Sequence, residues 1–156
     1  MATQHVNLTE ADLHETKGVS TAATGTILKA NAGVGAWSFQ EYSLVLDIAD
    51  IDTAASFFVV APYAGTITKI WSVIDTAITV ANNTLTCSIL SAGVTTAITN
   101  GTITIGFSGA VAGDVDSCVP TALNIVAAGD AIKIATDGGS TTATRCHITI
   151  IIARTA

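Results

Sequence analysis

Residues 145–154 read RCHITIIIAR, an alternation with a period of two residues. Every second position is apolar: Cys146, Ile148, Ile150 and Ile152. The positions between them are Arg145, His147, Thr149 and Ile151. Because successive side chains of a strand point to opposite faces, this pattern predicts a β-strand with one face in a hydrophobic core.

The same period recurs upstream, in runs bounded by Gly, Asn and Asp. We expect strands at Leu44–Ile48, Phe57–Ala61, Gly65–Asp75, Thr84–Leu90, Val94–Thr99, Thr102–Phe107, Asp130–Asp137 and Arg145–Arg154. Asn100-Gly101 lies between two of these runs and predicts a hairpin turn. Residues 109–124 form the longest expected loop. About eight strands joined by short turns indicate an all-β fold, an antiparallel β-sandwich of jelly-roll type.

The first 42 residues have a different character. Their middle reads KGVSTAATGTILKANAGVGAW, residues 17–37, in which four glycines exclude a helix. Large aromatic residues stand only at the end of this segment, at Trp37, Phe39 and Tyr42. We therefore expect an extended N-terminal arm over residues 1–42 and a β-sandwich domain over residues 43–156.

The composition points to a partner surface. Hydrophobic residues make up 49% of the 156 residues and charged residues 12%, about half the share in an ordinary globular protein. Several positions on the outward side of the expected strands are apolar, including Phe58, Val60 and Ile151. Apolar surface of this kind is typically covered by a partner.

Other features of the composition exclude some classes of partner. A formal net charge of −6 argues against nucleic-acid binding. Neither a signal peptide at Met1–Glu10 nor an apolar run of membrane-spanning length is found, so no membrane partner is expected.

Residues able to do chemistry are few, and the sequence predicts no catalytic, cofactor or metal site. His5, His14 and His147 lack a nearby nucleophile in any familiar arrangement. Turn capping explains the aspartates at 47, 50, 52, 114 and 116 better than calcium binding does. Trp71 is the one plausible aromatic platform for a sugar, with subunit packing as the favoured alternative. Cys87, Cys118 and Cys146 are odd in number and lack C-x-x-C spacing, which predicts free thiols in a reducing compartment.

Three phrases and the closing β run carry a resemblance to a known group of proteins. They are HETKGVSTAATGTILKANAGVGAW (14–37), VVAPYAGTITKIWSVID (59–75) and VAAGDAIKIATDGGS (126–140). Together they resemble the capsid decoration, or cement, proteins of tailed phages. The resemblance implies a non-enzymatic jelly-roll homotrimer, assembled in the host cytoplasm, that sits on the outer surface of the virion and binds the major capsid protein. Related phrases occur in head-fibre and tail-fibre proteins, so a glycan-binding host-recognition module remains the alternative.

Partner contacts are expected from both parts of the chain. The candidates are Trp37, Phe39 and Tyr42 in the arm and Phe58, Trp71 and Ile151 in the domain. Large aromatic side chains in an otherwise light segment are typical anchors of an interface. We also expect the arm to be cleaved by proteases in the free protein and protected in the assembly.

Overall fold

The computed structural model describes residues 26–31 and 34–155, which form strands and connecting loops without any helix. The described ranges thus contain no apolar helix of membrane-spanning length. The strands are β1 (Thr26–Asn31), β2 (Val34–Phe39), β3 (Glu41–Ile48), β4 (Ala55–Val60), β5 (Gly65–Ile74), β6 (Asn83–Ser91), β7 (Val94–Ile105), β8 (Val115–Cys118), β9 (Ile125–Val126), β10 (Ala131–Thr136) and β11 (Cys146–Arg154).

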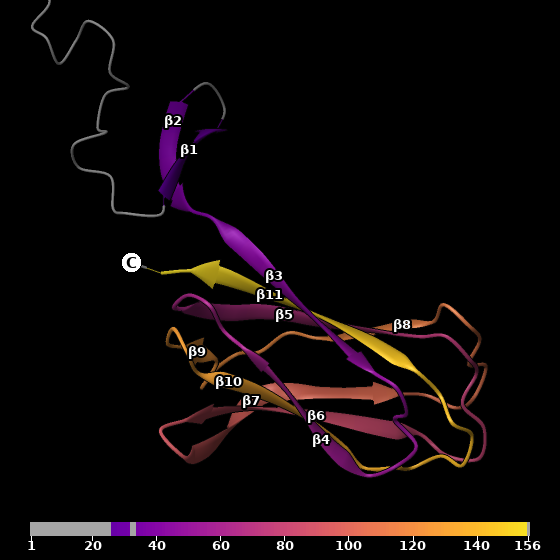
Figure 1. Cartoon of the computed structure of the whole chain (residues 1–156). Helices are drawn as coiled ribbons and strands as arrows, with labels where there is room; N and C mark the ends of the chain where they lie inside the picture. The colour runs from indigo at the N-terminus through magenta and orange to yellow at the C-terminus, as the bar shows by residue number, and fades with distance from the viewer. Residues whose placement is uncertain (1–25, 32–33, 156) are drawn as a thin grey trace, which may run out of the picture.

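Two antiparallel sheets pack face to face (Figure 1). One sheet has the order β4-β10-β6-β7, and the other has the order β3-β11-β5-β8, with β9 also paired to β5. The predicted antiparallel β-sandwich is therefore confirmed. Strands β1 and β2 pair with each other and form a separate two-stranded hairpin.

Strand β11 lies in the middle of its sheet, between β3 and β5. The register aligns Ile148 with Leu46 and Ser72, and Ile150 with Leu44 and Ile70. The alternation read from the sequence sets these faces correctly, since Cys146, Ile148, Ile150 and Ile152 are fully buried. Isoleucine dominates the core because its β-branched side chain packs well on a pleated surface.

The hairpin turn expected at Asn100-Gly101 is wrong. Strand β7 runs without interruption from Val94 to Ile105, and its pairing with β6 shifts register between Thr86 and Ser88. Asn100 has a φ of 58°, so the dipeptide forms an irregularity inside a long strand. The real turn is Ala92-Gly93, with φ values of 48° and 82°, as a two-residue type I′ hairpin requires.

Two further boundaries differ from expectation. The predicted loop over 109–124 contains the short strand β8, which pairs with β5 at the edge of the sheet. Strand β3 begins at Glu41 and so crosses the expected boundary between residues 42 and 43. Only Gln40 separates β3 from β2, so the final part of the arm leads directly into the sandwich.

Gly139 is required by a close backbone approach, and alanine there should destabilise the fold. A Cβ atom on Gly139 would collide with the carbonyl oxygen of Asn82. We expect Gly139→Ala to lower the free energy of unfolding by about 2 kcal/mol, because the backbone at the loop must shift. Gly106→Ala is the matched control, since a Cβ atom there meets nothing within 4 Å. Urea unfolding of both variants measures the difference, and equal midpoints would contradict this account.

Candidate partner surface

The outer face of the β3-β11-β5-β8 sheet carries an exposed, mainly apolar surface, which we call the Trp71 face. It consists of Val45, Trp71, Val115, Thr149 and Ile151. Strand register places Val45, Thr149 and Trp71 in one row across three strands. Val45 is 65% exposed and Trp71 38% exposed. Sequence alternation had put Trp71 and Ile151 on the outside of their strands, and the structure brings them together.

Trp71 forms one wall of a shallow groove in this face. The groove has a volume of about 300 Å³ and is lined by Trp71, Ser72, Val73, Val115, His147, Thr149 and Ile151. The Nζ atom of Lys69 lies 3.8 Å from the centroid of the Trp71 ring, which is a cation–π contact. Lys69 itself is not among the residues that line the groove.

Charges stand at one end of the Trp71 face. The Asp47 carboxylate lies 3.8 Å from Nε of Arg145 and 3.5 Å from Nδ1 of His147. Ion pairs this exposed contribute little to stability. Their position beside an apolar patch resembles the polar rim of a protein interface.

Phe58 lies on the other sheet, so the predicted contact residues do not form one patch. Phe58 and Val60 project outward from β4 and are 50% and 58% exposed. Lys133 of β10 is the cross-strand neighbour of Phe58. The sandwich therefore has an apolar outer surface on each of its sheets.

Tyr42 is held within the domain. Its hydroxyl donates a hydrogen bond of 2.5 Å to the carbonyl oxygen of Tyr63, and the two rings meet edge to face at 5.9 Å. Burial raises the pKa of Tyr42. The guanidinium of Arg154 lies 4.3 Å from the centroid of Tyr63. The side chains of Trp37 and Phe39 lie outside the described part of the structure, although the backbone of both belongs to β2.

Asp50 caps a turn, whereas Asp47 lies in β3 and Asp116 in β8. Asp50 accepts hydrogen bonds from the Thr53 hydroxyl at 2.7 Å and the Asp52 amide at 2.8 Å, and these bonds lower its pKa. Burial, with a smaller effect of Asp114, raises the pKa of Asp116. In the part of the chain that the structure describes, no three His, Cys, Asp or Glu residues are grouped as metal ligands.

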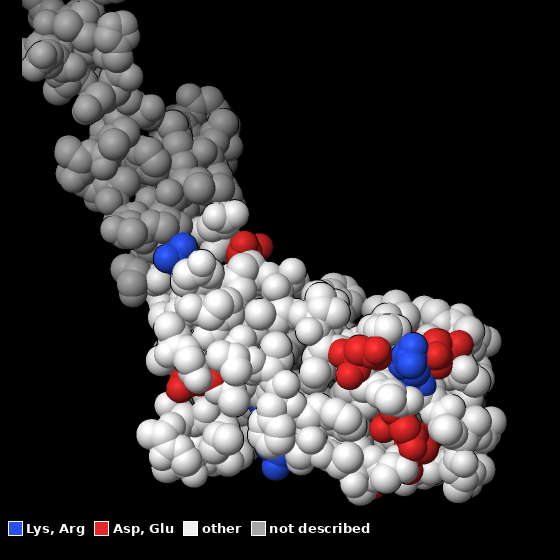
Figure 2. Space-filling model, in the orientation of Figure 1, with Lys and Arg blue, Asp and Glu red and all other residues white. Residues whose placement is uncertain are grey.

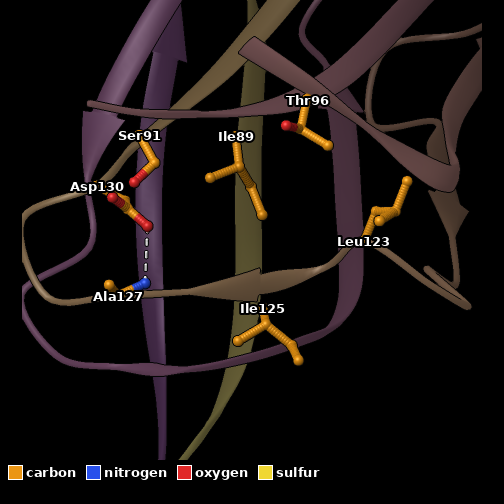
Figure 3. Close-up of a pocket in the computed structure, with 7 residues that line it drawn as sticks. All are labelled: Ile89, Ser91, Thr96, Leu123, Ile125, Ala127 and Asp130. Atoms are coloured by element: carbon orange, nitrogen blue, oxygen red, sulfur yellow. Dashed lines mark hydrogen bonds between the residues drawn. The ribbon is translucent and has the colours of Figure 1, made fainter. Parts of the chain in front are cut away.

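A second pocket lies beside the loop that precedes β9 (Figure 3). Its volume is about 420 Å³, and it is lined by Ile89, Ser91, Thr96, Leu123, Ile125, Ala127 and Asp130. Hydrogen bonds fix the backbone on both sides of Leu123: Thr99 donates to the Ala122 carbonyl at 2.9 Å, and Ile67 donates to the Asn124 carbonyl at 2.8 Å. Between these two bonds, Leu123 has a φ of 54° and is exposed. Sequence reasoning missed this pocket because residues 119–125 show no alternation.

The three cysteines are free and buried. Cys87 of β6 and Cys118 of β8 come from opposite sheets, and the Cys118 side chain, together with burial, raises the pKa of Cys87. Burial raises the pKa of Cys146 to about 12.

We expect Cys87 and Cys146 to resist alkylation at pH 8 in the native protein and to react once it is unfolded, because the thiolate is the reactive species and both pKa values are raised. Mass spectrometry after iodoacetamide treatment, without reductant, measures both states. A mass two hydrogens lower, with only one thiol modified after unfolding, would instead reveal a disulfide bond.

Comparisons with known proteins give little. No family model matches the chain, and no curated protein matches it. Among solved structures, a CocE/NonD family hydrolase from Staphylococcus aureus aligns at 7% identity with a TM-score of 0.42. The alignment covers 73% of this chain and 33% of that chain, so the protein spans about a third of the hydrolase's length. This similarity bears on neither the fold nor the function.

Proposed function

We propose that the protein is a structural virion protein that decorates the outer surface of a phage head. In this proposal it binds the major capsid protein, associates as a homotrimer and acts as a cement rather than an enzyme; its sandwich is a jelly roll. The observation that carries the proposal is the exposed apolar surface on both sheets, with Trp71 on one and Phe58 and Val60 on the other. The resemblance of the quoted phrases to decoration proteins supports the same assignment.

The physics of a shell fits this surface. A protein that binds only the assembled lattice stabilises that lattice by mass action. Many modest contacts repeated by symmetry give strong overall binding without a deep site. The net charge of −6 keeps such an outer layer soluble and away from DNA.

The non-enzymatic role is supported by the state of the candidate nucleophiles and bases. The Cys118 side chain, together with burial, raises the pKa of Cys87, and burial raises the pKa of Cys146, which makes both thiols poor nucleophiles at neutral pH. His147 lies on the outer face and pairs with Asp47 at 3.5 Å. That arrangement is an exposed surface contact rather than a base directed at a nucleophile.

Glycan binding by a fibre or adhesin is the second candidate. The groove beside Trp71 favours it, since carbohydrate sites combine a tryptophan with nearby polar groups. The contact of Lys69 with the indole ring weighs against it, because the ammonium group leaves less of the ring free for a sugar to stack on.

The test uses heads of the phage that encodes the chain, assembled without this protein. We expect saturable co-sedimentation of the purified protein with these heads, and heads that withstand higher temperature once decorated. A virion reconstruction should show the protein at local three-fold positions on the shell. Absence of head binding, combined with retention on a host glycan surface, would contradict the decoration proposal and favour the adhesin.

A further inference from the structure

Strand β4 is an unprotected sheet edge. It ends the order β4-β10-β6-β7, and in the described ranges it pairs with β10 alone. Its sequence, ASFFVV, contains neither a charged residue nor a proline. Natural edge strands normally carry such residues, because an apolar edge with free backbone groups recruits further strands.

The direction of the free backbone groups follows from two hydrogen bonds. The amide of Ala61 donates to the carbonyl of Asp130 at 2.9 Å, and the amide of Ala55 donates to the Thr136 hydroxyl at 3.1 Å, both toward the β10 side. Because an antiparallel strand alternates its backbone groups between its two sides, those of Ser56, Phe58 and Val60 point away from β10. The edge therefore offers a set of donors and acceptors to a further strand.

The interior of the sandwich is also incompletely covered on this side. Phe57 and Val59 of β4, and Leu44 and Leu46 of the neighbouring edge strand β3, pack against the core yet are only partly buried. Figure 2 shows a broad area without charge over the sandwich, with the charged residues gathered mainly at one end. A strand added along β4 would cover part of this apolar surface.

Among the residues that the structure describes, the β1–β2 hairpin lacks a third strand, which would stabilise it. It consists of two strands of six residues each, which pair with each other. A hairpin of two strands is at best marginally stable in water. Its register places Leu28 opposite Trp37 and Thr26 opposite Phe39, so Leu28, Trp37 and Phe39 lie on one face of the hairpin.

The hairpin of one copy cannot pair with edge strand β4 of the same copy. Gln40 alone connects β2 to β3, and the hairpin extends past the end of the sandwich (Figure 1). We propose that the β1–β2 hairpin of one copy adds to edge strand β4 of a second copy and extends its β4-β10-β6-β7 sheet. Each hairpin strand matches the six residues of β4 in length. This inference rests on the proposed self-association and not on capsid binding.

The contact is of the head-to-tail kind. Each copy contributes its hairpin to one neighbour and binds the hairpin of another neighbour at its β4 edge, so the interface is heterologous. Such an interface closes into a ring when the rotation that relates neighbouring copies is a whole fraction of a turn. A closed trimer would pair every hairpin and cover every β4 edge.

The decisive variant is Ser56→Pro, with Ser56→Ala as its matched control. The amide of Ser56 points away from β10, so proline should leave the sandwich folded while it removes one donor from the free edge. We expect self-association of Ser56→Pro to weaken at least about tenfold in sedimentation, with Ser56→Ala unchanged. Hydrogen exchange should show the amides of Phe58 and Val60 protected in assembled wild type and exposed in Ser56→Pro.

The hairpin supplies a second matched pair. Leu28→Asp, on the apolar face, should weaken self-association, and Ile27→Asp, on the opposite face, should not. If Ser56→Pro fails to fold, Val60→Lys replaces it, since an outward lysine is a natural block to edge pairing.

An oligomeric wild type whose assembly is unaffected by both β4 variants would overturn the inference and leave the trimer standing. A monomeric wild type with unprotected β4 amides would also overturn it, while co-sedimentation with heads would still test decoration separately.

Discussion

Replacing Asn83 with leucine should lower the free energy of unfolding by about 3 kcal/mol, because two buried groups lose their partners. Asn83 is fully buried at the start of β6. Its Oδ1 atom accepts a hydrogen bond of 2.9 Å from the Ser140 amide, and its Nδ2 group donates to the Asp52 carboxylate. Leucine has a similar volume but can do neither.

The expected loss is large because the network continues beyond Asn83. The Ser140 hydroxyl donates to the carbonyl of Thr79 and accepts from its amide, both at 3.2 Å, so Asn83 helps hold two loops at one end of the sandwich. For a chain of this length the loss corresponds to a fall in Tm of about 6–12 °C. Thermal unfolding followed by circular dichroism measures it.

Asp52→Asn is the matched control within the same network. The Oδ2 atom of Asp52 is buried without a hydrogen-bond partner, while its Oδ1 atom accepts the bond from Asn83. Asparagine retains an acceptor for that bond and removes a poorly solvated charge. We therefore expect a Tm equal to or above that of the wild type. A similar fall in both variants would show that the Asn83 hydrogen bonds are not the cause.

The strand faces could be predicted from the sequence because they depend on local alternation. In the expected strand Thr84–Leu90, alternation places the apolar Leu85, Cys87 and Ile89 on one face, and all three are buried. Asn83 lies just before that expected strand, and only the tertiary structure shows that it enters the core. The expected turn at Asn100-Gly101 fails for a similar reason: the dipeptide permits a turn, but β7 pairs with β6 both before it, at 94–97, and after it, at 102–105.

The candidate surface could be predicted only in part. Period-two alternation puts Trp71 and Ile151 on outer positions, but their meeting depends on the register between β5 and β11, which shifts between Ile151 and Ile152. Phe58 was expected in the same interface and belongs to the other sheet. Which outer positions share a surface is determined by long-range pairing, and alternation along one strand carries no information about that pairing.

Single substitution of Trp71, Ile151 or Phe58 with aspartate should disrupt an interface, giving monomers, insoluble protein or oligomers that no longer bind heads. An aspartate at a covered interface position would be buried without a partner in every copy, at a cost of several kcal/mol. Val94→Asp is the matched control, because Val94 is also apolar, is 65% exposed and lies at the β6–β7 turn, away from both apolar surfaces. Sedimentation at micromolar concentration measures the oligomer, and co-sedimentation with undecorated heads measures binding.

Comparison of the three variants distinguishes contact between copies from contact with the capsid. Trp71 and Ile151 lie on the Trp71 face, whereas Phe58 lies on the β4 edge that we assign to the hairpin of a second copy. If Phe58→Asp yields monomers while Trp71→Asp yields oligomers that no longer bind heads, the β4 edge holds copies together and the Trp71 face meets the capsid. If all three variants assemble and bind heads as the wild type does, neither apolar surface is an interface and the decoration proposal loses its main support.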